Sequence, residues 1–348
     1  MIQVHARLVA SVAVPYARQL VNGWGKAYRV GGTVVVGIVV GDDLVAHRLD
    51  ALLAGEVRPA TRFPVPADSF PHGAMVAPDL SGAVFPMSGG SSGVCRVDSA
   101  GALRWRWRYS YCDGDALVSS DGRWVWTVVA DGADGAVEGP VSVVVLDAAN
   151  GRESGRIAVP DATLRQDQLI AHPGGRQVAV VGAREGEEGP YWSTAYWVRP
   201  QPGVGLQLRQ YPSGSEAITG FDPCGTVVAM TDVYAKYVRL RRFDSGAPLL
   251  TVRAGTATEF AAYTGFLDST TMLASSGTGQ NDAEHWLLDT SHDGSGPAED
   301  NLGGPRTHPV RYPPVGPQHP LPHLWALGDG TWLTADPGTL YRWTTAAG

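Results

Sequence analysis

One turn signature returns about seven times along the chain and constrains its fold more than any other feature. Each copy is a Gly-, Asp- or Pro-marked turn between two apolar runs, and in most copies a later run ends in an apolar residue followed by Asp and a Gly turn. Successive copies lie roughly 40 to 60 residues apart, at 30–33, 78–82, 120–122, 172–175, 222–225, 267–269 and 328–330. This period, with several strands in each copy, is typical of radially repeated β-sheets.

Each repeat is interpreted as four short strands. In the third repeat the predicted strands are 116–119, 124–129, 141–146 and 152–159, with turns at 120–122 and 147–151. Glycine supplies positive φ in such turns, and Asp or Asn bonds to its own backbone. A single repeat cannot bury both faces of its sheet, so we expect neighbouring sheets to pack face to face.

The two ends of the chain complement each other. The last repeat has apolar segments at 324–326, 330–334 and 339–344 and then stops one strand short. Residues 3–9 alternate as a strand does and could supply the missing one, which would remove a loose sheet edge. The prediction is one all-β domain over 1–348, a seven-bladed β-propeller of four-stranded blades with the N-terminal strand closing the last blade.

This arrangement resembles the WD-repeat-like family of seven-bladed β-propellers over essentially the whole chain. The Trp-Asp dipeptide and the Gly-His pair of the eukaryotic type are absent. Two stacked β-sandwiches would also give many short strands separated by turns. The repeat period and the missing last strand favour the propeller.

Composition narrows the class of protein further. Charged residues make up 18% of the chain, with 44 Gly and 25 Pro, which suits a turn-dense β protein. A net charge of −7 argues against nucleic acid as a partner, and three cysteines are too few for a disulfide scaffold. With no apolar run near the ~20 residues of a membrane span and no secretion signal, we expect a cytoplasmic monomer that does not bind membranes.

In a propeller, the first strand of each blade begins at one mouth of the central channel. Six repeats carry a polar or ionisable residue 7–10 positions before the turn: His72, Asp115, Gln168, Glu216, Glu259 and His323. Two histidines and three carboxylates on one axis could hold a divalent metal ion or pair a general acid with a general base. The predicted catalytic residues are therefore His72, Asp115, Glu216, Glu259 and His323. Polar residues also line a solvated channel mouth without any function, so both interpretations stay open.

Other motifs leave the chemistry unspecified. No HxxEH or CxxC spacing occurs, and 89–93 lacks the Lys of a phosphate loop, so we predict no nucleotide or flavin site. Aromatic residues fall in loops expected near the mouth, and the predicted substrate-binding residues are Trp24, Tyr111, Gln168, Tyr191 and Trp192. They could bind a cationic or aromatic small molecule, or they could fill gaps between blades.

Two segments stand out by composition. The alternation of Arg and Trp over 104–108 predicts an outer strand with Trp turned inward and Arg guarding the edge. Residues 301–323 contain seven prolines and three histidines and are expected to be an irregular lid or binding loop, or a surface flap.

Two functions of different class follow. The first is a small-molecule enzyme of lyase, cyclase or hydrolase type, which resembles the streptogramin lyases in architecture only; that resemblance implies metal-assisted His/Glu chemistry. The second is a non-catalytic propeller that binds a protein partner through its loop rim. The sequence slightly favours the first because the chain has no further module.

Overall fold

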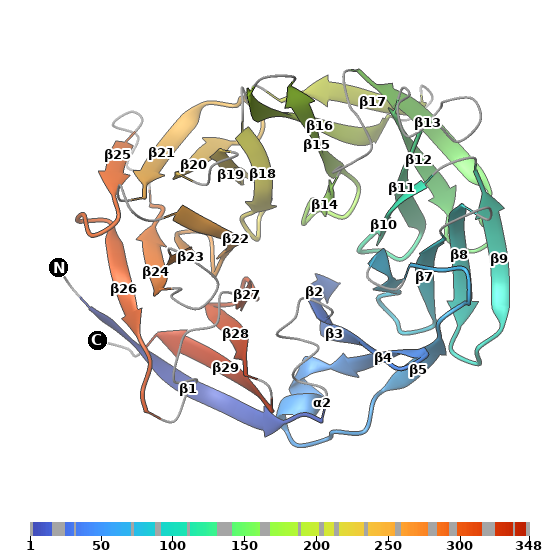
Figure 1. Ribbon diagram of the computed structural model, residues 1–348, viewed down its shortest axis with the longest axis horizontal. Coiled ribbons are helices and arrows are strands. Elements are labelled where there is room, and N and C mark those ends of the chain that lie inside the picture. The colour runs from blue at the N-terminus through green and yellow to red at the C-terminus, as the bar shows by residue number, and fades with distance from the viewer. Residues whose placement is uncertain are drawn as a thin grey trace. The chain divides into compact units, whose positions relative to one another are not determined.

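Four-stranded antiparallel sheets, formed by consecutive strands, make up almost all of the computed structural model (Figure 1). The structure describes residues 3–15, 25–30, 33–70, 73–87, 92–109, 112–130, 141–160, 168–186, 189–201, 205–211, 216–232, 236–254, 259–277, 284–291, 298–314, 324–336 and 338–345. The chain divides into two compact units: unit 1 comprises 1–23, 53–55 and 216–348, and unit 2 comprises 24–52 and 56–215. The single domain over 1–348 stays a prediction.

Unit 2 contains four sheets, each ordered as the chain runs. Their strands are β2 (Gly25–Val30), β3 (Thr33–Val40), β4 (Asp43–Arg48) and β5 (Thr61–Pro64); β6 (Met75–Val76), β7 (Gly82–Met87), β8 (Gly93–Asp98) and β9 (Leu103–Arg108); β10 (Cys112–Val118), β11 (Trp124–Ala130), β12 (Val141–Asp147) and β13 (Glu153–Val159); β14 (Gln168–Ala171), β15 (Val178–Gly186), β16 (Gly189–Gln201) and β17 (Gly205–Gln210). The four strands predicted for the third repeat are confirmed as β10 to β13.

Unit 1 contains three further sets of four antiparallel strands. They are β18 (Glu216–Phe221), β19 (Val227–Asp232), β20 (Tyr237–Arg242) and β21 (Pro248–Arg253); β22 (Glu259–Phe266), β23 (Thr271–Gly277), β24 (Glu284–Asp289) and β26 (Thr307–Arg311); β27 (Leu324–Ala326), β28 (Thr331–Ala335), β29 (Thr339–Thr345) and β1 (Val4–Ala13). β1 pairs with β29 from Ala6↔Thr345 to Ala13↔Thr339. The prediction that an N-terminal strand completes the last sheet is confirmed, and this strand runs four residues beyond the predicted 3–9.

Two parallel strand additions distinguish unit 1. β25 (Ala298–Asn301) joins β21 as a fifth strand, from Leu250↔Ala298 to Arg253↔Asn301. β1 also pairs in parallel with β26, at Val4↔Val310 and His5↔Arg311, and so joins two of the sets into one eight-stranded sheet.

Apolar side chains fill the spaces between successive sheets within each unit. In unit 2, Trp126, Val143 and Val198 belong to a buried cluster shared by the sheets of β11 and β16. In unit 1, Trp332 and Trp343 are fully buried with Leu273 between the four-stranded sets that contain β23 and β28. Successive residues of a strand point to opposite faces of the sheet, so the continuous apolar run of a strand such as β12 places apolar side chains on both faces. The sheets therefore pack face to face.

Asp222 shows how the repeated turn is held between β18 and β19. Its buried carboxylate accepts hydrogen bonds from the amides of Thr226 (2.6 Å), Val227 (2.7 Å) and Cys224 (3.3 Å). An Asp that satisfies several turn amides explains why this residue type recurs at the repeat.

We expect Asp222→Ala to lower the free energy of unfolding by about 2 kcal/mol, because the turn amides lose a buried charged acceptor. Asp268 occupies the equivalent turn of the next sheet but is more exposed and accepts from Thr270 N and Oγ1 only. Asp268→Ala is therefore the matched control, with an expected loss below about 1 kcal/mol. Urea unfolding of both variants measures the difference, and equal losses would contradict the account.

Two sequence predictions were wrong in this part of the chain. Residues 301–323 are not irregular throughout, because β26 lies within them and pairs Trp286↔Pro309 and Leu288↔Thr307. Pro309 has no amide hydrogen to donate. A proline is tolerated in a strand at a position where its nitrogen would make no hydrogen bond to a neighbouring strand. After β4, the pattern of an apolar residue, Asp and a later Gly at Leu49, Asp50 and Gly55 predicts the end of a strand and a turn, but a short helix α2 (Leu49–Leu53) begins there, with Leu49 and Leu52 buried. Among the described residues, no helix is long and apolar enough to cross a membrane.

The two cysteines whose side chains are described differ in exposure. Cys95 on β8 is fully buried, and this burial raises the pKa of its thiol to about 11, whereas Cys224 is exposed. In a Cys112→Ala background, we expect a thiol reagent to modify Cys224 at once and Cys95 only after unfolding, because the thiolate is the reactive form. Peptide mass mapping after timed labelling checks this order; fast labelling of Cys95 in the native protein would contradict it.

Candidate functional site

The structure describes the side chains of two residues of the predicted site. Glu216 and Glu259 each begin the first strand of a sheet, β18 and β22. Of the others, His72, His323, Trp24 and Tyr111 lie outside the described residues. Asp115, Gln168, Tyr191 and Trp192 lie in β10, β14 and β16, but their side chains are not among those described. Their roles stay predictions.

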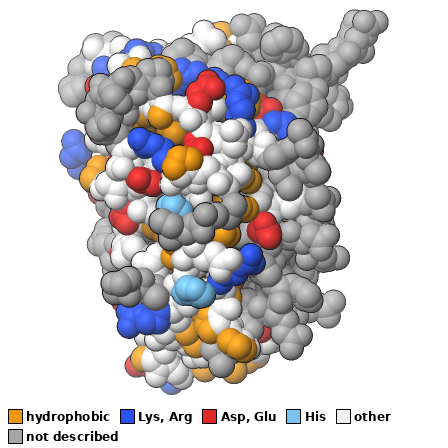
Figure 2. Space-filling view, turned by 90° about the vertical axis from the view of Figure 1, so that its left-hand side faces the viewer, with side chains coloured by type: hydrophobic (Ala, Val, Ile, Leu, Met, Phe, Trp, Pro, Cys, Tyr) orange, Lys and Arg blue, Asp and Glu red, His pale blue; other side chains and the backbone are white. Residues whose placement is uncertain are grey.

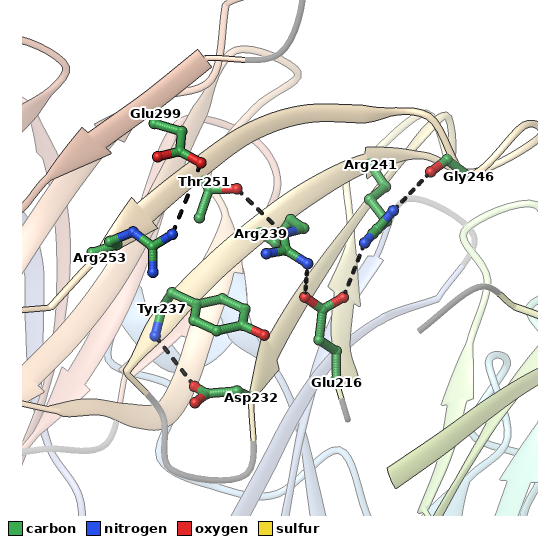
Figure 3. Close-up of polar contacts among 9 residues, drawn as sticks. All are labelled: Glu216, Asp232, Tyr237, Arg239, Arg241, Gly246, Thr251, Arg253 and Glu299. Carbon is green, nitrogen blue, oxygen red and sulfur yellow. Dashed lines mark hydrogen bonds and ion pairs between the residues drawn. The ribbon is translucent and has the colours of Figure 1, made fainter. Parts of the chain in front are cut away.

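Glu216 is the centre of an ion-pair cluster on one face of the β18–β21 sheet (Figure 3). Its carboxylate is almost fully buried, and one oxygen pairs with Arg239 Nη1 while the other lies 3.3 Å from Arg241 Nη2. The order of the sheet is β18-β19-β20, so the Glu216 side chain reaches across β19 to the third strand. Both carboxylate oxygens are therefore occupied by guanidinium groups.

The sequence of β20 explains why both arginines face Glu216. Tyr237, Arg239 and Arg241 alternate with Val238 and Leu240, which belong to the apolar cluster of the opposite face. Alternate residues of a strand point to the same side, so the polar set shares one face of the sheet. Both guanidinium groups have further acceptors, Thr251 Oγ1 at 3.3 Å for Arg239 and the Gly246 carbonyl at 3.1 Å for Arg241.

Tyr237 completes the cluster. The guanidinium carbon of Arg239 lies 4.8 Å from the centre of the Tyr237 ring, which is a cation–π geometry. Burial raises the pKa of Tyr237 to about 12, assisted by the negative charge of Glu216 and a hydrogen bond to it. The phenol therefore stays protonated at neutral pH and acts as a donor.

Glu259 has a different environment. Its carboxylate is mostly exposed and lies 2.9 Å from Lys236 Nζ, which precedes β20. Such a surface pair contributes little free energy because water and salt screen it. Glu216 and Glu259 thus begin neighbouring sheets, but each is paired with its own basic partner.

The basic partners of both carboxylates were not predicted from the sequence. The alternation Tyr237-Val238-Arg239-Leu240-Arg241 was a usable signal, because it predicts a strand with three polar residues on one face. It did not indicate which acidic residue would meet that face. The part of the chain that the structure describes contains no group of three or more His, Cys, Asp or Glu side chains placed to hold a metal ion.

No protein-family model and no curated protein matches the chain. Among solved structures, it is similar to Kluyveromyces lactis Hsv2, with a TM-score of 0.54, 10% identity and coverage of 95% of this chain and 88% of that chain. It is also similar to KlAtg21 in complex with the coiled coil of AgAtg16, with a TM-score of 0.54, 11% identity and coverage of 82% and 84%. A third similar structure is acylaminoacyl peptidase in complex with Z-Gly-Gly-Phe-chloromethyl ketone, with a TM-score of 0.51 and 10% identity; it covers 96% of this chain, which spans 53% of the enzyme chain.

The chain has a β-propeller fold, as these neighbours do. At 10% and 11% identity the similarity concerns the fold alone. The neighbours include a peptidase and a protein solved in complex with a coiled coil. The seven-blade count and the WD-repeat-like type stay predictions.

Proposed function

We propose that this protein is a non-catalytic propeller that binds a protein partner. The observation that carries the proposal is the pairing of Glu216 with Arg239 and Arg241. A general base must lie within hydrogen-bond reach of the substrate proton. The Glu216 carboxylate is buried and has both oxygens occupied, so its role is to hold strands together.

Glu259 supports the same proposal less strongly. It is exposed to solvent, and its carboxylate pairs with Lys236. Catalytic carboxylates are typically tuned by burial or by a nearby like charge. The two described members of the predicted catalytic set thus resemble structural ion pairs rather than an acid–base pair.

The competing hypothesis is the small-molecule enzyme of lyase, cyclase or hydrolase type, with or without a divalent metal ion. It now depends on His72, Asp115 and His323, because Glu216 and Glu259 have other partners. Alanine variants at His72 and His323 that keep the parent melting temperature and abolish a measured turnover would favour the enzyme over the binding protein.

The binding proposal is tested by isolating the tagged protein from its native host at moderate salt. We expect a second polypeptide at a fixed stoichiometric ratio, and we expect Trp192→Ala on the predicted rim to reduce its recovery if the rim is the contact surface. A protein that is isolated alone and turns over a small molecule would overturn the proposal.

A further inference from the structure

The edge strand β9 is the most unusual surface of unit 2. It reads Leu103-Arg104-Trp105-Arg106-Trp107-Arg108 and is the terminal strand of its sheet, so one of its edges has no strand partner among the described residues. Arg104 and Arg108 are exposed, as is Leu103, whereas Trp105 is buried. The predicted outer strand with Trp inward is confirmed.

The tryptophans fix β9 against the next sheet. Trp105 Nε1 donates to the Ala148 carbonyl at 2.9 Å. Trp107 stacks on Tyr109 with ring centres 5.4 Å apart, and the Arg156 guanidinium carbon lies 4.5 Å from the Tyr109 ring centre. The aromatic side chains thus anchor β9 to the next sheet, and an incoming strand would meet a backbone that is already extended.

The backbone groups of two arginines point outward from this edge. The Tyr109 amide donates to the Ser92 carbonyl on the β8 side at 3.0 Å. Because inward and outward groups alternate along an antiparallel strand, the amide and carbonyl of Arg108 and Arg106 face the open edge. A bulge at Arg104 ends this regular alternation.

Unit 1 shows how such an edge is occupied. β21 is the fourth strand of its sheet, as β9 is, and the acidic segment Ala298-Glu299-Asp300-Asn301 of β25 lies along it in parallel. The Arg253 carbonyl accepts from the Leu302 amide at 2.9 Å, and the Arg253 side chain lies 3.9 Å from Glu299. An arginine of the edge strand thus binds the added strand through its backbone and its charge.

The charges around the two edge strands also differ. On the side of unit 1 that carries β25 and β26, acidic and basic side chains are interspersed (Figure 2). By contrast, β9 places three arginines on a six-residue strand, and the carboxylates that pair with them, Asp98 with Arg104 and Asp68 with Arg106, come from the same sheet and the loop before it. Among the described residues, no carboxylate pairs with Arg108.

We propose that the open edge of β9 binds an extended acidic segment of a protein partner as a fifth strand, as β21 binds β25. The inference rests on the proposed binding function and assigns a surface and a partner chemistry to it. Main-chain hydrogen bonds would give affinity, and the alternating arginines would select carboxylates at every second position.

The test uses a fluorescein-labelled peptide of four alternating Glu-Val pairs and fluorescence anisotropy at low salt. We expect saturable binding that Arg104→Glu/Arg108→Glu weakens at least tenfold, because two exposed positive charges are reversed. Arg7→Glu/Arg311→Glu, on exposed positions of β1 and β26 with the same change in net charge, is the matched control and should bind as the parent does.

Two further measurements separate strand addition from simple charge attraction. Peptide binding should slow hydrogen exchange at the amides of Arg106 and Arg108, and Arg108→Pro, which removes an outward amide without a ladder bond to β8, should also weaken binding. Equal binding by the parent and the Arg104→Glu/Arg108→Glu variant, or binding of a thymidine oligonucleotide in place of the peptide, would overturn the inference. If a natively isolated partner binds the Arg104→Glu/Arg108→Glu variant normally, the edge assignment fails while the proposed binding function stands.

Discussion

Replacement of Glu216 by alanine is expected to lower the free energy of unfolding by about 3 to 5 kcal/mol, because it leaves two guanidinium groups without their buried counter-charge. Arg239 and Arg241 are each mostly buried, with side chains 25% and 15% exposed, so partial access to water places the expected loss at the lower end of this range. Urea unfolding at pH 7, followed by tryptophan fluorescence, measures the loss.

Glu259→Ala is the matched control for this prediction. Glu259 also begins a first strand, but its ion pair with Lys236 is exposed, and its loss should cost less than about 1 kcal/mol. Glu216→Gln keeps the shape of the side chain and an acceptor oxygen, and it should fall between the two. A Glu216→Ala protein as stable as the parent would show that the carboxylate is not a structural ion pair and would restore it as a catalytic candidate.

Acid should destabilise the protein through His47, by about 2 kcal/mol between pH 7 and pH 5. His47 is fully buried on β4, and burial, assisted by the nearby Arg62 charge, lowers its pKa to about 4. In the unfolded chain the ordinary pKa is about 6.5, so the unfolded state binds a proton that the folded state does not. Stability is therefore fully present above pH 6.5 and falls as the pH drops toward 4.

Other groups titrate over the same range, so the prediction is a difference between two proteins. His47→Gln cannot take up the proton, and its free energy of unfolding should fall by about 2 kcal/mol less than that of the parent over this interval. Urea titrations at pH 7 and pH 5 give the free energies of unfolding of both proteins at both pH values. Identical pH dependence in the parent and His47→Gln would mean that His47 is protonated as easily in the folded protein as in the unfolded chain.

The sequence predicted the repeated sheets well because the information is local. A turn such as 222–225 is specified by an Asp that bonds to nearby amides and a Gly with positive φ, and Gly225 does have φ +71°. The strand complementing the last sheet was also predictable, since an incomplete repeat at one end implies its missing strand at the other. These features need no knowledge of distant contacts.

Strands without local signals were missed. β25 reads Ala-Glu-Asp-Asn, residue types that are mostly depleted in strands, and it forms because the β21 edge offers Arg253 and open backbone groups. β26 contains Pro309 in a proline-rich stretch, and it forms a strand because it pairs with the edge of β24. In both strands, pairing with the edge of a strand that is distant in the sequence outweighs the low local propensity for β-structure.

The candidate site could be predicted only in part for the same reason. The position of Glu216 at the beginning of a first strand was correct, but its chemistry is set by two arginines more than twenty residues away in the sequence. A single sequence shows which residues share a face of β20, and it does not show which carboxylate lies opposite that face.

The proposed binding of a protein partner, in place of acid–base chemistry at Glu216 and Glu259, is best tested by calorimetric titration with the polypeptide that co-purifies with the protein. The account predicts saturable binding at a fixed ratio, with Glu259→Ala and folded Glu216→Gln binding as tightly as the parent. Absence of any saturable binding by the parent would contradict it.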